Sequence, residues 1–166
     1  GHIAGKALVA TEDMESKIRA AAGERMNPNT FIIARTDARE VVGMDEALRR
    51  GERYLRAGAD GLFIEAPESV EEMAQIGRAF DVPLLANMLE GGRTPILRPA
   101  QLEELGFRIV IYGISLLMRI TRTMQETLQD ILSGELKLSG TGVSFSEYKS
   151  IVGMDRWSRI EDQYKP

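Results

Sequence analysis

The sequence predicts an α/β fold built on a parallel sheet. Four short apolar runs recur, with starts 30, 22 and 25 residues apart, at 31–34, 61–64, 83–88 and 108–112. Each interval leaves room for one strand, one helix and two loops. The runs are continuously apolar, as in strands that are covered on both faces. Helical patterns separate them, so the sequence predicts right-handed crossovers between neighbouring strands.

The first two helices are predicted from their apolar periodicity. One begins at Thr11, which is suited to be its N-cap, and it carries Met14 and Ile18 on one face behind an acidic first turn. The other covers about 44–57 and ends at Gly58.

Two further helices are predicted from their end signals. Ser69 with Glu72 three residues later has the pattern of a capping box. Pro99 and Gly106 mark the start and the end of a shorter helix.

A long amphipathic helix is predicted at about 115–132, after the fourth strand. Its apolar positions are Leu116, Leu117, Ile120, Met124, Leu128, Ile131 and Leu132. This helix covers the core, or it also packs on a partner subunit. The predicted organisation is a sheet-bearing part, 1–133, followed at 134–166 by a Gly-rich linker, a short helix at about 145–152 and a docking tail with Trp157 and Tyr164.

The amino-acid composition limits the classes of function that this protein can have. The 166 residues are 43% hydrophobic, enough for one sizeable core, and 21 basic residues are interspersed with 25 acidic ones. We therefore expect no nucleic-acid partner. No apolar stretch has the length of a membrane span, and without cysteine there is no disulfide or thiolate metal site. A cytoplasmic protein is expected, and the start at GHIAGK without Met suggests a piece of a longer chain.

Polar side chains follow each apolar run: Arg35 and Asp37, then Glu65, then Asn87 and Glu90, then Tyr112. Parallel strands bring their carboxyl ends to one edge, where α/β proteins bind ligands. A cation, a carboxylate and an amide there suit a small anionic carboxylate substrate. Arg35 would grip a carboxylate through paired N–H donors, and Glu65 would hold or move a proton.

Simpler interpretations exist for the same residues. Arg35 and Asp37 can form a structural ion pair, Glu65 can be an acidic loop residue, and Asn87 can cap the loop that follows it. The stretch GGRT at 91–94 lacks the spacing of the known phosphate-binding loops. Because His2 is the only histidine, a His-rich metal site is excluded.

Five stretches, in order and over nearly the whole chain, carry a resemblance to a known family: GHIAGK, FIIARTDAR, GADGLFIEAPES, VPLLANMLEGGRTPIL and LEELGFRIVIYGISLL. They resemble the isocitrate lyase/phosphoenolpyruvate mutase superfamily. The likeness is greatest to its small lyase branch, which contains 2-methylisocitrate lyase, dimethylmalate lyase, oxaloacetate hydrolase and enzymes like carboxyvinyl-carboxyphosphonate phosphorylmutase.

The resemblance implies a (β/α)8 TIM barrel, of which this chain would supply strands five to eight and the C-terminal helices. It implies a carbon–carbon lyase that cleaves a 2-hydroxy di- or tricarboxylate by Mg²⁺-assisted retro-aldol chemistry, with this segment alone inactive. The Mg²⁺ ligands would lie mostly upstream, with none in this segment. It also implies a homotetramer in which a terminal helix is exchanged.

Residue roles follow from the same resemblance. Arg35 and Glu65 would be catalytic, with Arg35 also binding the substrate carboxylate and Glu65 acting as acid/base or orienting group. Gly1, His2 and Asn87 would line the substrate pocket. Gly1 and His2 are what this chain retains of a Lys-Lys/Arg-Cys-Gly-His signature whose Cys donates a proton.

Departures from the family pattern bear on the substrate. Leu89 and Gly91 replace Thr and Phe of the 2-methylisocitrate lyases, which favours the branch with LEGG, and Gly113 replaces a common proline. RTDA favours carbon–carbon lyases over mutases. Two alternatives stay open: oxaloacetate hydrolysis or phosphorus–carbon chemistry on the same scaffold, and a catalytically silent assembly module.

Overall fold

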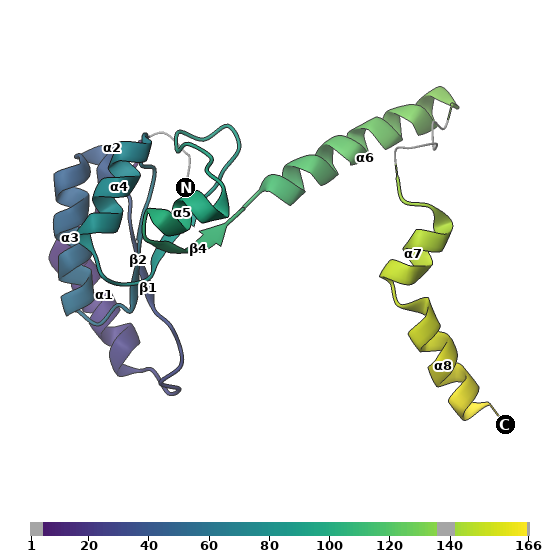
Figure 1. The fold of residues 1–166 in the computed structure, drawn as a ribbon, viewed down its shortest axis with the longest axis horizontal. Coiled ribbons are helices and arrows are strands. Elements are labelled where there is room, and N and C mark those ends of the chain that lie inside the picture. Colours follow the sequence, from purple (N-terminus) through teal and green to yellow (C-terminus); the bar gives the residue numbers. More distant parts are fainter. Residues whose placement is uncertain (1–4, 136–141, 166) are drawn as a thin grey trace. The chain divides into compact units, whose positions relative to one another are not determined.

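A computed structural model describes residues 5–135 and 142–165. The chain divides into two compact units, Gly1–Met118 and Arg119–Pro166, with the boundary inside one helix. Figure 1 shows the order of the elements along the chain. The helices are α1 (Thr11–Gly23), α2 (Ala38–Val41), α3 (Met44–Arg56), α4 (Val70–Ala79), α5 (Pro99–Glu104), α6 (Ser115–Ser133), α7 (Phe145–Ile151) and α8 (Met154–Tyr164).

The first unit is built on a four-stranded parallel sheet in the order β1-β2-β3-β4. Its strands are β1 (Ile33–Thr36), β2 (Gly61–Ile64), β3 (Leu84–Asn87) and β4 (Phe107–Ile111). Each strand pairs with the next along the chain, so a helix-containing connection crosses over between every pair. The predicted α/β fold with a parallel sheet is confirmed.

The first strand begins later than predicted. The sequence predicted a strand at the apolar run 31–34, whereas β1 in the structure covers 33–36. Arg35 therefore lies inside β1 and not beyond its end. The reason is Asp60, whose Oδ2 accepts the Ile32 N–H at 2.8 Å, while the Ile32 carbonyl accepts the N–H groups of Asp60 and Gly61. A side chain therefore holds the residues before the strand, and regular pairing starts at Ile33.

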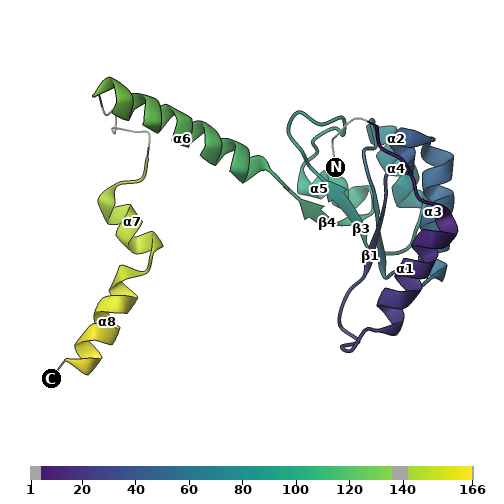
Figure 2. The same ribbon diagram turned by 180° about the vertical axis from the view of Figure 1, so that it is seen from behind.

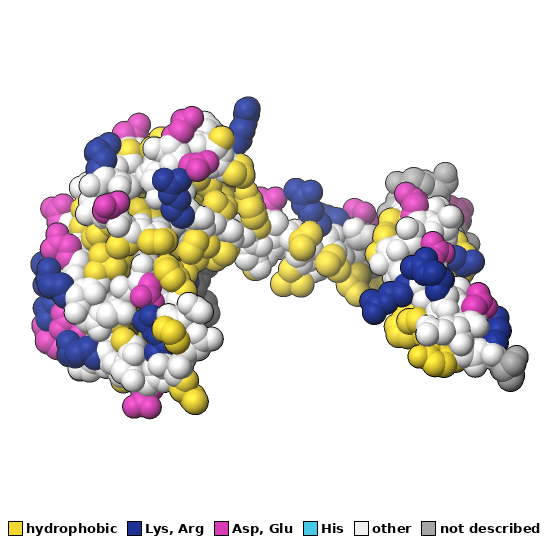
Figure 3. Space-filling model, turned by 60° about the horizontal axis from the view of Figure 1, so that its bottom comes forward, with side chains coloured by type: hydrophobic (Ala, Val, Ile, Leu, Met, Phe, Trp, Pro, Cys, Tyr) yellow, Lys and Arg dark blue, Asp and Glu magenta, His cyan; other side chains and the backbone are white. Residues whose placement is uncertain are grey.

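Helices α3 and α4 lie along one side of β1 and β2 (Figures 1 and 2), and α3 contacts both strands. The hydrophobic core of this unit includes side chains that are at most 3% exposed, among them Ala34, Ala47, Tyr54, Leu62, Ile64, Met73, Ile76, Leu84 and Leu102. Figure 3 shows hydrophobic side chains gathered around a hollow on one face of this unit. Phe31, just before β1, is 49% exposed, and Ile111, the last residue of β4, is 37% exposed.

The helix starts differ in part from prediction. Thr11 is not an N-cap: Ala10 takes that position, and the Thr11 side chain is buried as the first helical residue. Ser69 caps α4 as predicted, by accepting the Glu72 N–H. The Glu72 carboxylate turns to Arg39 and to the Glu68 N–H, so it does not close the capping box.

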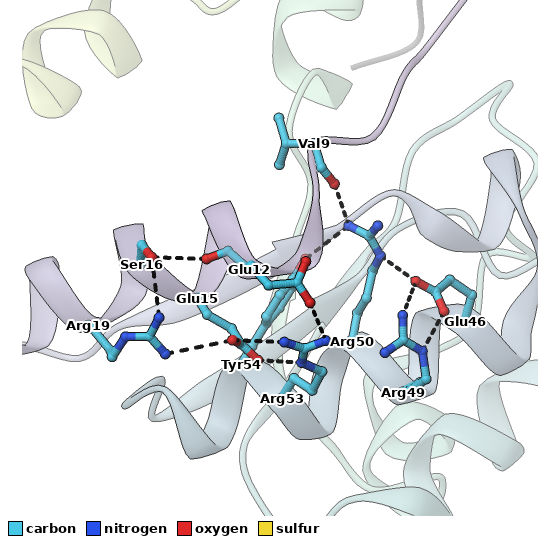
Figure 4. Close-up of polar contacts among 10 residues, drawn as sticks. All are labelled: Val9, Glu12, Glu15, Ser16, Arg19, Glu46, Arg49, Arg50, Arg53 and Tyr54. Atoms are coloured by element: carbon cyan, nitrogen blue, oxygen red, sulfur yellow. Dashed lines mark hydrogen bonds and ion pairs between the residues drawn. The ribbon is translucent and has the colours of Figure 1, made fainter.

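Ion pairs join α1 to α3 on the outside of the unit (Figure 4). Arg53 pairs with both Glu12 and Glu15 of α1. Arg50, only 8% exposed, donates to the Val9 carbonyl at 3.0 Å and pairs with Glu46 at 2.7 Å. These bonds fix the segment before α1 against α3.

The C-terminal segment is more helical than predicted. Helices α6 and α7 lie where the sequence predicted them, and the predicted docking tail with Trp157 and Tyr164 forms a further helix, α8, that was not predicted. Of the predicted linker, residues 136–141 lie outside the described residues. The apolar stripe of α6 is exposed, with Leu116 at 74% and Leu128 at 59%. In the described ranges, no helix combines the length and apolar character needed to cross a membrane.

Candidate active site at the carboxyl end of the sheet

Arg35 projects from β1 on the face of the sheet opposite to the buried neighbours Ala34 and Thr36. Its Nε donates to Asp37 Oδ2 at 2.8 Å, and its Nη2 donates to Asp37 Oδ1 at 2.9 Å. Its guanidinium stands 4.9 Å from the ring centroid of Phe63, the residue opposite it in the β1–β2 register. Stacking on an aromatic face and a two-point bond to a carboxylate both restrict a guanidinium plane.

Glu65 follows β2 directly and is 3% exposed. Its backbone N–H donates to the Thr36 carbonyl at 3.0 Å, which continues the β1–β2 pairing by one residue. Its Oε2 lies 3.2 Å from Arg35 Nη2. The next residue, Ala66, has a positive φ of 58°, an uncommon backbone conformation for a residue with a Cβ that turns the chain sharply after Glu65.

Asn87 is the last residue of β3. Its Oδ1 is buried and has no hydrogen-bond partner among the described residues. Gly113, just after β4, lies beside this oxygen, since a Cβ built on Gly113 would stand 3.8 Å away. A buried amide oxygen without a donor is costly, and a bound ligand with a hydroxyl group would satisfy it.

These residues surround a cleft of about 260 Å³. It is lined by Glu65, Ala66 and Asn87 from the strand ends, by the loop residues Leu89, Gly91, Gly92, Arg93 and Thr94, and by Lys6 and Glu40. Arg35 lines an adjoining hollow of about 350 Å³ that shares Lys6 with the cleft. The structure thus brings Arg35, Glu65 and Asn87 together at one edge of the sheet. Gly1 and His2 lie outside the described residues, and Tyr112 is 51% exposed and is not part of either lining.

Charged residues that sequence reasoning did not assign complete the site. Lys6 Nζ lies 2.8 Å from Asp37 Oδ1 and 2.6 Å from Glu40 Oε2. Hydrogen bonds from Arg35 and from Lys6, together with their charges, lower the pKa of Asp37 to about 2, although burial opposes this shift. Lys6 belongs to GHIAGK, one of the stretches that carry the family resemblance. No feature of that stretch indicates that Lys6 pairs with Asp37 and Glu40.

A second set of ion pairs ties the loops of the site together. Arg93, in the loop after β3, lies 3.1 Å from Glu68 and 3.7 Å from Glu40. Arg39 of α2 pairs with Glu68 at 2.6 Å and with Glu72 at 2.7 Å. The loops that follow β1, β2 and β3 are therefore linked by charge around the cleft.

The donor set does not fit a metal ion. Within residues 5–135 and 142–165, no three His, Cys, Asp or Glu side chains cluster closely enough to hold one. The carboxylates of the site face Lys6, Arg35, Arg39 and Arg93.

Comparison with known proteins shows that the sequence is similar to those of two lyases. The chain is 44% identical over 167 residues to 2,3-dimethylmalate lyase of Eubacterium barkeri, which covers 99% of this chain and 57% of that protein. It is 42% identical over 132 residues to 2-methylisocitrate lyase of Aeropyrum pernix, which covers 80% of this chain and 42% of that protein. The chain spans about half the length of these relatives.

Solved structures share the fold. A crystal structure of 2,3-dimethylmalate lyase has a TM-score of 0.83 at 32% identity and covers 97% of this chain and 58% of its own. Oxaloacetate acetylhydrolase with 3,3-difluorooxalacetate has a TM-score of 0.85 at 26% identity, with coverages of 98% and 56%. Phosphonopyruvate hydrolase with oxalate and Mg²⁺ has a TM-score of 0.79 at 27% identity, with coverages of 98% and 60%.

The family itself is shown by the sequence. Residues 2–132 match the profile of the family described as phosphoenolpyruvate phosphomutase. The resemblance drawn from the five motif stretches is thereby confirmed. The chain belongs to the phosphoenolpyruvate phosphomutase family, within the phosphoenolpyruvate mutase/isocitrate lyase superfamily.

Proposed function

We propose that this chain is the part of a TIM barrel that carries strands five to eight, in a carbon–carbon lyase that cleaves a 2-hydroxy di- or tricarboxylate. The observation that carries the proposal is that Glu65 and Asn87 line one cleft while Arg35, in the adjoining hollow, pairs with Glu65 at 3.2 Å. The names of the related lyases support the reaction type. The hollow face with exposed apolar side chains supports a partial barrel, because the missing strands would cover it.

The reaction is a retro-aldol cleavage. A base removes the proton of the 2-hydroxyl group, the C2–C3 bond breaks, and C2 becomes the carbonyl carbon of a 2-oxo acid. The bonding electrons pass to C3, whose carboxylate takes up the charge as an enolate, and a proton delivered to C3 completes the step. The enzyme must neutralise this developing charge in a site that excludes water.

Arg35 would perform that task. Its hydrogen bonds to Asp37 use Nε and Nη2, and its ion pair with Glu65 also involves Nη2, so Nη1 has no partner in the described part of the chain. This leaves two N–H groups for a substrate carboxylate. Glu65, buried beside Arg35, would hold or move the hydroxyl proton, and the Asn87 oxygen would accept a hydrogen bond from a substrate hydroxyl.

The proposal includes Mg²⁺ because a protein of similar structure, phosphonopyruvate hydrolase, was solved as a complex with oxalate and Mg²⁺. Because the described residues offer no metal-binding cluster, we place its ligands in the upstream part of the protein. None of the roles proposed for Arg35, Glu65 and Asn87 involves the metal.

We further propose that the protein is a homo-oligomer, in line with the tetramer with exchanged helices that the resemblance implies. The support is the exposed apolar stripe of α6, in which Ile120, Met124 and Leu128 are each more than half exposed. A stripe of this kind is stable in water when another surface covers it. The partner would be a second copy of the chain, with no part for nucleic acid or a membrane.

Assays of the full-length protein test the reaction. Dimethylmalate, 2-methylisocitrate, oxaloacetate and phosphonopyruvate are supplied separately with Mg²⁺, and the products are identified. Cleavage of either hydroxy acid supports the proposal. Turnover of oxaloacetate alone would establish the second candidate, a hydrolase, which the high structural similarity to oxaloacetate acetylhydrolase favours. No turnover of any of the four would favour the silent assembly module.

A further inference from the structure

Lys6 stands between the two hollows of the site and lines both. Its side chain is 17% exposed and makes two short ion pairs, to Asp37 Oδ1 at 2.8 Å and to Glu40 Oε2 at 2.6 Å. Burial acts to lower the pKa of Lys6, but the hydrogen bonds to the two carboxylates outweigh it and raise the pKa. The ammonium group is therefore charged at neutral pH.

Lys6 is linked to the predicted catalytic residues through one carboxylate. Asp37 Oδ1 accepts from Lys6 and also from Arg35 Nη2 at 2.9 Å, and Arg35 Nη2 in turn lies 3.2 Å from Glu65. A change in the position of Asp37 would therefore move the guanidinium that contacts Glu65. Chains of charge-assisted bonds of this kind transmit orientation from one group to the next.

The backbone that carries Lys6 is itself fixed. Three residues further on, the Val9 carbonyl accepts a hydrogen bond from Arg50 at 3.0 Å, and Arg50 is held by Glu46 at 2.7 Å (Figure 4). Arg50 is 8% exposed, so the donor of this bond is buried, although Val9 itself is 46% exposed. Lys6 thus extends toward Asp37 from a segment that is hydrogen-bonded to α3.

The positive charge of Lys6 also affects the electrostatic potential of the site. Asp37, Glu40 and Glu65 bring three carboxylates to the site, while Arg35 contacts two of them and Arg93 approaches Glu40 only to 3.7 Å. Without Lys6, Asp37 and Glu40 would lose a shared cation at the rim of the cleft. The resulting negative potential would oppose a dianionic ligand.

We propose that Lys6 is a positioning residue for anion binding at this site, holding Asp37, and through it Arg35, in the geometry that receives a substrate carboxylate. The inference rests on the proposed function for the identity of the substrate. It does not depend on that function for its test, because binding of a small dicarboxylate is measured without turnover.

The test compares Lys6→Gln, Lys6→Arg and Arg53→Gln in the full-length protein. Oxalate with Mg²⁺ is the probe, and its dissociation constant is measured by calorimetry, with KM and kcat added for any substrate that is cleaved. Arg53 is the matched control, since it also pairs with two carboxylates but lies between α1 and α3, away from the cleft. Melting temperatures show that each variant is folded.

Lys6→Gln should weaken oxalate binding about tenfold and raise KM similarly, whereas Lys6→Arg should restore binding to within about threefold. Arg53→Gln should bind oxalate like the unsubstituted protein. Unchanged oxalate affinity in Lys6→Gln overturns the proposal, as do an equal loss in Arg53→Gln and an absence of oxalate binding by the unsubstituted protein. If oxalate binds but no substrate is cleaved, the proposed lyase reaction fails and the role of Lys6 is still decided by the binding data.

Discussion

Gly77 in α4 packs against the turn after α5 so closely that a methyl group has no room. A Cβ built on Gly77 would lie 1.7 Å from the Leu105 carbonyl oxygen and 2.9 Å from its carbonyl carbon. Because carbon–oxygen contacts lie at about 3.3 Å or more, α4 and this turn would have to separate by about 1.6 Å in Gly77→Ala.

The cost of this movement is set by what the turn connects. It joins α5 to β4, and it lies between Leu102 and Phe107, which are 0% and 5% exposed. The clashing atoms are backbone, so no side-chain rotamer can relieve the contact. Overpacking of this severity destabilises the folded state by about 3 kcal/mol, and the better helix propensity of Ala offsets about 1 kcal/mol of this. We expect Gly77→Ala to lower the free energy of unfolding by about 2 kcal/mol.

Urea denaturation followed by circular dichroism measures this difference. Gly23→Ala is the matched control, because Gly23 is also helical, at the end of α1, and a Cβ there would meet no atom within 4 Å. It should leave the free energy of unfolding unchanged or raise it by up to about 1 kcal/mol. If Gly77→Ala unfolds at the same urea concentration as the unsubstituted protein, the packing argument is refuted.

Four further predictions concern the site and the C-terminal helix. Arg35→Ala should reduce kcat/KM at least about a hundredfold in a steady-state assay, since an aimed donor is lost; activity near that of the unsubstituted protein would remove its assigned role. Asn87→Leu should raise KM about tenfold, because the acceptor for a substrate hydroxyl is removed. Asp37, with its pKa lowered to about 2 from 3.8, contributes stability that is present above pH 3.8 and lost toward pH 2, so the difference in melting temperature from Asp37→Asn should shrink over that interval. Leu128→Glu should reduce the oligomer mass measured by light scattering, and an unchanged mass would contradict the role of α6.

Much of the fold could be predicted because its signals are local. Strands β2, β3 and β4 lie within one or two residues of the predicted runs, since continuous apolar stretches between helical patterns have few other structural solutions. The start of β1 was wrong because Asp60, 28 residues away, accepts the Ile32 N–H. Helix α8 was not predicted, although Met154, Trp157 and Ile160 recur in it at helical spacing, so its periodic signal was present in the sequence.

The site was predictable to the extent that it follows from sheet topology. Parallel strands share an edge, so residues near the ends of successive strands meet there: Glu65 and Asn87 line one cleft, and Arg35, one residue before the end of β1, pairs with Glu65. The partners of Lys6 could not be read from the sequence, because an ion pair between residues 31 positions apart leaves no pattern along the chain. The same holds for Arg93, whose acidic partners are Glu40 in α2 and Glu68 in the loop after β2.

The two interpretations of Arg35, a structural ion pair and a substrate ligand, are compatible in this geometry. Asp37 takes one edge of the guanidinium through Nε and Nη2, which fixes its plane above Phe63. The other side of the guanidinium, at Nη1, is then oriented, and no residue in the described part of the chain pairs with it, so we propose that it receives a carboxylate. A lysine has one nitrogen and no plane, so it cannot hold Asp37 and present a second oriented edge. Arg35→Lys should therefore lose nearly as much kcat/KM as Arg35→Ala although the charge is kept, and full activity in Arg35→Lys would show that charge alone suffices.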